Sequence, residues 1–66
     1  MQIMKLTKRE IEILKLVAQG LTYQEVADKL GNKRSTIGNQ MRTIILKLGV
    51  RNQMQAVKAF EKKEKQ

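Results

Sequence analysis

The sequence contains no cysteine, histidine, proline or tryptophan, and these absences exclude several kinds of function. Without cysteine or histidine the chain forms no disulfide, has no catalytic thiol and lacks the usual zinc ligands. No side chain is a natural general base near neutral pH. With 66 residues it is one domain, too small for a deep catalytic cleft. We therefore expect no enzyme activity, no metal site and no cofactor.

Long apolar runs are also missing. The longest are only a few residues, far short of the roughly 20 residues that a membrane-spanning helix needs. Residues 1–5 lack the apolar core of a targeting segment. A single phenylalanine and no tryptophan leave few anchors for a membrane surface. These features predict a cytoplasmic protein without membrane contact.

Acidic residues are scarce, and their distribution is uneven. Fourteen Lys and Arg residues oppose six acids, giving a net charge of +8. Between Asp28 and Glu61 there is no acid, whereas the same stretch carries seven of the basic residues. A region of one charge sign attracts polyanions and accelerates their encounter. The alternative interpretation is a solvated basic surface without a partner.

Local sequence patterns predict where helices begin. Thr7 with Glu10, and Thr22 with Glu25, have the spacing of capping boxes, in which each side chain satisfies a backbone N–H of the other residue. Asn52 is a suitable N-cap for a last helix. Apolar residues follow each start with helical spacing.

Glycines mark the ends of the predicted helices. Gly20, Gly31 and Gly49 each follow a helical pattern, and glycine readily adopts the positive φ that terminates a helix. No stretch alternates with a period of two, so no strand is expected. The sequence predicts an all-α domain of four helices, followed by a charged tail at residues 61–66 that frays.

The helical spacing also predicts the core. Ile11 lies off the apolar stripe and is expected to be exposed. The predicted core residues are Leu6, Ile13, Leu14, Val17, Leu21, Val26, Leu30, Ile37, Ile44, Leu48 and Val57.

The second and third helical segments form a helix-turn-helix pattern. The link over residues 20–22 is short, so the first two helices should cross as neighbours. The third segment, from about Lys33 to Gly49, carries Asn39, Gln40 and Arg42 on its polar side. Such side chains pair with base edges in the major groove, while nearby cations neutralise phosphates.

Several motifs in order resemble the LuxR-type (GerE-like) family of bacterial transcription regulators. They are LTKRE at residues 6–10, IL at 13–14, GLT at 20–22, EVA at 25–27 with Leu30, TI at 36–37 with Asn39, KLGVRN at 47–52 and QAV at 55–57. The similarity covers roughly residues 5–60. It implies a four-helix LuxR-type helix-turn-helix domain whose third helix enters the major groove of double-stranded DNA.

The resemblance also implies which residues contact DNA. Asn39 and Arg42 are the candidates for base contact. The candidates for backbone contact are Thr22, Tyr23, Lys33, Arg34, Ser35, Thr36, Gln40 and Lys47. The plainer interpretation of each is a solvated helix surface, or, for Tyr23, a packed ring with a hydrated hydroxyl.

The fourth helix is the surface through which the resemblance implies a homodimer. Met54, Gln55 and Lys58 are its candidate interface residues, and two-fold symmetry would then predict a nearly palindromic DNA site. Ile3, Met4 and Ile11 also fall outside the apolar stripes, which fits either an interface or scattered surface hydrophobes.

Three positions depart from the family pattern. Lys33 stands where a Ser or Thr often caps the recognition helix, which makes Asn32, with a helix starting one residue earlier, the alternative cap. Gly38 replaces a residue that is often basic and reads bases, so it either permits close approach to DNA or weakens contact. Gln40 replaces a frequent histidine. The target sequence is therefore not transferable from a relative.

The predicted organisation is an N-terminal extension at residues 1–5, the LuxR-type domain at 6–60 and the charged tail at 61–66. Such domains usually follow a receiver or ligand-binding domain, so we expect either a stand-alone regulator or an excised domain. Two other functions remain open. One is an interaction protein that sequesters a LuxR-type regulator in heterodimers, and the other is a sigma-factor-like promoter-binding domain.

Overall fold

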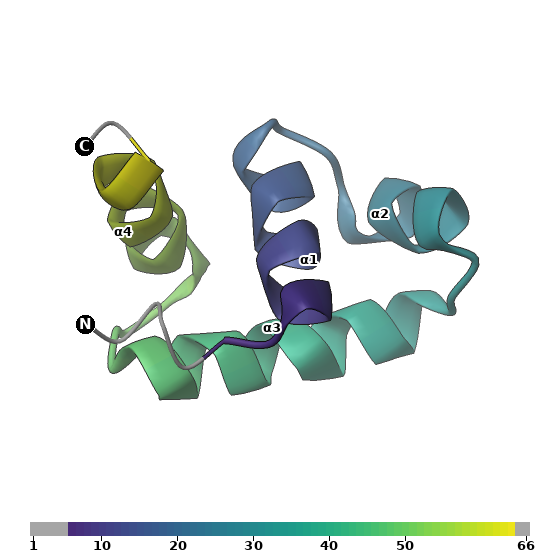
Figure 1. Cartoon of the computed structure of the whole chain (residues 1–66). Coiled ribbons are helices and arrows are strands. Elements are labelled where there is room, and N and C mark those ends of the chain that lie inside the picture. Colours follow the sequence, from purple (N-terminus) through teal and green to yellow (C-terminus); the bar gives the residue numbers. More distant parts are fainter. Residues whose placement is uncertain (1–5, 65–66) are drawn as a thin grey trace.

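The computed structural model describes residues 6–64, which form four helices and no β-strand (Figure 1). The helices are α1 (Lys8–Ala18), α2 (Tyr23–Leu30), α3 (Arg34–Leu48) and α4 (Gln53–Glu64). The predicted all-α class and helix count are confirmed. The extension at residues 1–5, including Ile3 and Met4, lies outside the described residues.

Local hydrogen bonds set the starts of three helices as predicted. The Thr7 backbone N–H donates to Glu10 Oε1 (2.8 Å), and the Glu10 N–H donates to Thr7 Oγ1 (3.1 Å). Thr22 and Glu25 repeat this capping box at α2. At the start of α4 the Gln55 N–H donates to the side chain of Asn52 (3.0 Å).

The ends of the helices bring one confirmation and two corrections. Gly31 and Gly49 end α2 and α3 with φ of 73° and 69°, which suits glycine because it has no Cβ. The charged segment expected to fray is helical as far as Glu64. The link between α1 and α2 spans residues 19–22 and is one residue longer than predicted.

The start of α3 corrects the prediction that Asn32 is the alternative cap. Lys33 occupies the N-cap with an extended backbone, and the helix begins at Arg34. The Lys33 carbonyl accepts the Thr36 and Ile37 N–H groups, and no side chain caps this end. A lysine side chain carries only donors, so it cannot accept from the first N–H groups of the helix.

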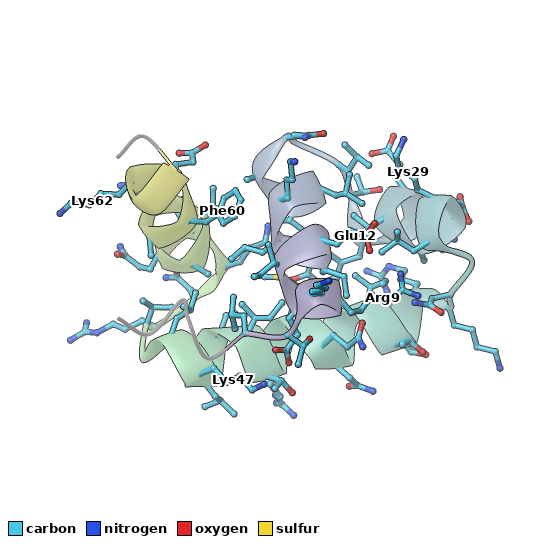
Figure 2. The ribbon with its side chains drawn as sticks, viewed as in Figure 1. Arg9, Glu12, Lys29, Lys47, Phe60 and Lys62 are labelled. Atoms are coloured by element: carbon cyan, nitrogen blue, oxygen red, sulfur yellow. The ribbon has the colours of Figure 1, made fainter. Side chains whose placement is uncertain are left out.

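The core lies between α3 and the three helices that cover one of its sides. Leu21, Leu30 and Val57 are half-buried against this core, and the other predicted core residues are buried. Phe60 lies between α4 and α1 (Figure 2). Residues that the prediction did not include in the core but that are buried there are Leu16, Ala27, Met41, Ala56 and Phe60.

This packing leaves one side of α3 open. Figure 1 shows α1, α2 and α4 on the same side of α3, and no helix among residues 6–64 covers the opposite side. Within residues 6–64, none of the helices combines the length and apolar character needed to cross a membrane.

Candidate nucleic-acid interface

The outward face of α3 consists of side chains spaced three or four residues apart. Asn39, Arg42, Thr43 and Leu46 follow the i, i+3, i+4, i+7 pattern that places residues on one helix face, and all four are exposed. The buried residues of α3 lie on the other side: Ile37, Met41, Ile44 and Leu48. Both predicted base-contacting residues, Asn39 and Arg42, therefore point away from the core.

The first turn of α3 adds positive charge to this side. Lys33, Arg34 and Ser35 are exposed, Thr36 is half-buried, and the turn contains no acid. The first N–H groups of a helix have no intrahelical acceptor, and here no side chain caps them. Together with the helix dipole they make this end attractive to an anion. Backbone amides, the Ser35 hydroxyl and the cations of Lys33 and Arg34 thus all belong to the start of α3.

The start of α2 lies beside this region. The Thr22 hydroxyl accepts a hydrogen bond from the Glu25 N–H, so its own hydrogen is available to a phosphate. The Tyr23 hydroxyl donates to Oε1 of Gln53 at the start of α4 (2.6 Å). A phosphate contact by Tyr23 would require this hydroxyl to change its partner.

The ring of Tyr23 faces Gly38 of α3. A Cβ placed on Gly38 would lie 3.9 Å from Cδ2 of the ring, which is an ordinary van der Waals distance. Burial raises the pKa of Tyr23, and the charge of Arg34 partly opposes this shift. The tyrosine therefore links α2, α3 and α4 as a neutral side chain.

Lys47 is engaged inside the domain. Its Nζ lies 2.9 Å from Glu10 Oε1, and Glu10 is only 7% exposed. Burial alone would raise the pKa of Glu10, but hydrogen bonds from Lys47 and Thr7 and the charge of Lys47 outweigh it, so the pKa is lowered. The expected helix cap is confirmed for Glu10, and Lys47 is identified as its basic partner.

Gln40 is also partly withdrawn from the surface. It is half-buried, and its Oε1 is buried without a hydrogen-bond partner in the described part of the chain. The structure thus gathers Asn39, Arg42 and the first turn of α3 on one open side, while Lys47 and Gln40 lie at its margin. The candidate dimer residues Met54, Gln55 and Lys58 are exposed on a different helix, α4.

Two features of this region were missed by the sequence analysis. Leu46 is 73% exposed on the outward face of α3, and its spacing of seven residues from Asn39 was a usable signal. The Tyr23–Gln53 hydrogen bond joins residues 30 positions apart, for which the sequence offers no signal.

A short helix, a tight turn at a left-handed glycine and a second helix with an open polar face define a helix-turn-helix DNA-binding domain. The model of the family described as "Bacterial regulatory proteins, luxR family" matches residues 4–60. The chain belongs to this family, and the predicted resemblance is confirmed.

Similar proteins agree with the family match. The response regulator RamR of Streptomyces coelicolor is 40% identical over 58 residues, covering 88% of this chain and 29% of that protein. The transcriptional regulatory protein LnrK of Bacillus subtilis is 42% identical over 55 residues, covering 83% and 25%. DesR, a transcriptional regulatory protein of the same species, is 40% identical over 58 residues, covering 88% and 29%.

The chain therefore spans between a quarter and three tenths of the length of these relatives. What it shares with them is the DNA-binding domain of a transcription regulator. This family is a family of DNA-binding regulatory domains and not of enzymes.

Proposed function

We propose that this domain binds a short inverted repeat in double-stranded DNA as a dimer, with α3 of each copy in a major groove. The observation that carries this proposal is the open face of α3, where Asn39 and Arg42 are exposed beside a cationic first turn. No acid occurs between Asp28 and Glu61 to repel phosphates. Acting on bacterial DNA, the domain would work in the cytoplasm.

The two base-contacting candidates suit different bases. The Arg42 guanidinium matches O6 and N7 of guanine, and the Asn39 amide matches N6 and N7 of adenine. Contacts with phosphates fix the register of the helix in the groove. Their candidates are Thr22, Tyr23, Lys33, Arg34, Ser35, Thr36, Gln40 and Lys47.

The dimer is proposed through α4. Met54 is 65% exposed, and Lys58 lies one helical turn further on the same face, with Gln55 beside them. One face of a 12-residue helix offers much less than the roughly 1,200 Å² that stable interfaces bury. We therefore expect the domain to be monomeric in solution and to pair on DNA.

Selection of bound duplexes from a random pool, at one fixed salt concentration, tests this proposal. The expected result is an enriched motif with two symmetric half-sites whose centres are about one helical turn apart. Enrichment of a single half-site would refute the dimer but would remain consistent with sequence recognition by α3. If no motif is enriched, the proposed function itself is wrong.

The sequestering interaction protein stays the second candidate because of Gly38. At this position, where the resemblance implies a basic reading residue, there is no side chain to contact a base. Absence of an enriched motif, combined with co-sedimentation of the domain with a full-length luxR-family regulator, would favour sequestration. The matching family model is that of luxR-type regulatory proteins, so it does not support the sigma-factor alternative.

A further inference from the structure

Leu46 is a large apolar side chain on a face that is otherwise polar. It is 73% exposed, more than Ile11 (36%) or Met54 (65%). The residues through which α3 packs into the core lie on the opposite side of the helix: Ile37, Met41, Ile44 and Leu48. Core packing therefore does not account for a leucine at position 46. A single exposed leucine is not unusual in itself, so the inference rests on its position, on the same outward face of α3 as Asn39 and Arg42.

The position of Leu46 relative to Arg42 and Asn39 indicates that its ligand is the same DNA duplex that these two residues contact. Leu46 lies four residues after Arg42 and seven after Asn39, which corresponds to about 6 Å and 10.5 Å along the helix axis. Base pairs are spaced about 3.4 Å apart, so Leu46 lies about three base pairs beyond Asn39. Since none of the described helices covers this side of α3 (Figure 1), one major groove of DNA can receive all three side chains.

The surroundings favour a duplex over an apolar protein surface. Arg42 is exposed one turn before Leu46, and α3 carries no acid. An apolar partner would have to desolvate the guanidinium, whereas DNA supplies it with acceptors. Among the four bases, only thymine presents an apolar group, its C5-methyl, in the major groove.

We propose that Leu46 contacts the C5-methyl group of a thymine and thereby helps to determine the sequence that the domain selects. The thymine lies about three base pairs from the base pair that Asn39 contacts, on the side toward the C-terminal end of α3. This inference rests on the proposed function, because it requires α3 to lie in the major groove.

Replacing thymines by deoxyuridine, one at a time, in the selected duplex tests the contact. The replacement removes only the methyl group and leaves the hydrogen-bonding edge of the base intact. For the wild-type domain we expect one position in each half-site to lose about four-fold in affinity, the value of one buried methylene-sized group. In Leu46→Ala the same replacement should have no effect, and every other position should respond as it does in the wild-type domain.

Ile11→Ala is the matched control, since Ile11 is an exposed apolar residue on α1. This variant should keep the wild-type deoxyuridine profile. The inference is overturned if no single replacement weakens the wild-type domain, or if Leu46→Ala keeps the wild-type profile. It is also overturned if Leu46→Ala changes the sedimentation of the free domain, because Leu46 would then contact protein. In each case selective binding by the wild type would leave the proposed function standing.

Discussion

At the scale of single residues, Arg42 and Lys33 are expected to contribute to DNA binding in different ways. Arg42 points outward from the middle of α3, and Lys33 is exposed at its start. A bidentate contact with a base discriminates among sequences, whereas a contact with a phosphate strengthens binding to every sequence. Replacing Arg42 should therefore change sequence discrimination, whereas replacing Lys33 should change the affinity for all sequences.

Arg42→Ala should cost about 1–3 kcal/mol on the matched duplex and reduce discrimination against a scrambled one. Lys33→Ala should weaken binding to both duplexes and reduce the salt slope by about one. Fluorescence anisotropy at several salt concentrations measures both effects. Lys15→Ala on α1 removes an exposed cation away from α3 and should behave as wild type. Unchanged binding in both α3 variants would contradict the assigned roles.

Gly38 is a residue whose replacement should stabilise the fold. It lies inside α3 with a helical backbone, and an added Cβ would meet only the Tyr23 ring at 3.9 Å. Gly38→Ala should therefore increase the free energy of unfolding by about 0.5–1 kcal/mol in urea denaturation. Gly31→Ala is the contrasting control, because its φ of 73° should make alanine destabilising. Destabilisation by Gly38→Ala would show that the helix is strained there.

At the scale of helices, the Glu10–Lys47 pair ties the start of α1 to the end of α3. Replacing Glu10 by Gln should lower the free energy of unfolding by about 1–3 kcal/mol at pH 7, because a charge-assisted hydrogen bond is lost. The control is Glu12→Gln, whose partner Arg9 lies 3.4 Å away in an exposed pair. Exposed pairs contribute little, so this control should change stability by less than about 1 kcal/mol.

The same pair predicts a pH dependence. Folding lowers the pKa of Glu10 from its ordinary value of 4.5. The stability contributed by the carboxylate is therefore complete above that value and is lost as the pH falls through the lower pKa of the folded state. Chemical denaturation at pH 7 and at several pH values below 4.5 should show the difference between wild type and Glu10→Gln shrinking. A difference that stays constant with pH would contradict this role of the ionised carboxylate.

How far each helix was predictable depended on the range of the interactions that define it. Thr7, Thr22 and Asn52 cap helices through partners three residues away, so the sequence displays both halves of each motif. The start of α3 has no side-chain cap and left Asn32 and Lys33 as alternatives.

Long-range partners were not predictable for a different reason. Lys47 and Glu10 are 37 positions apart, and which lysine reaches Glu10 depends on how α1 crosses α3. The same holds for Tyr23 and Gln53. Asn39 and Arg42 were placed correctly on the outside of α3, because helical periodicity alone decides which side a residue faces.

At the scale of the whole molecule, binding as a pair depends on surfaces outside α3. Met54→Gln replaces the exposed apolar side chain of α4 with a polar one of similar size. Burying a methionine is worth about 1.5–3 kcal/mol, so affinity for the inverted repeat should fall about ten-fold or more. Affinity for an isolated half-site should not change. Sedimentation of both complexes measures this, with Ile11→Gln as control, and equal losses on both duplexes would contradict pairing through α4.

The charge distribution of the whole domain also favours α3 as the element that contacts DNA. The chain carries a net charge of +8. Its 32 residues from Lys29 to Phe60 contain no acid, and this stretch includes all of α3. Such a field draws the domain to DNA of any sequence, and the outward face of α3 then provides the selectivity.

Titration of the isotope-labelled domain with its selected duplex, followed by NMR of the backbone and side-chain N–H groups, tests the central claim most directly. The account predicts that the largest shifts fall on residues 33–46, with the Asn39 and Arg42 side-chain signals among them, and that the exposed side of α1 around Lys8, Ile11 and Lys15 is unaffected. Shifts concentrated on α1, with the outward face of α3 unchanged, would contradict it.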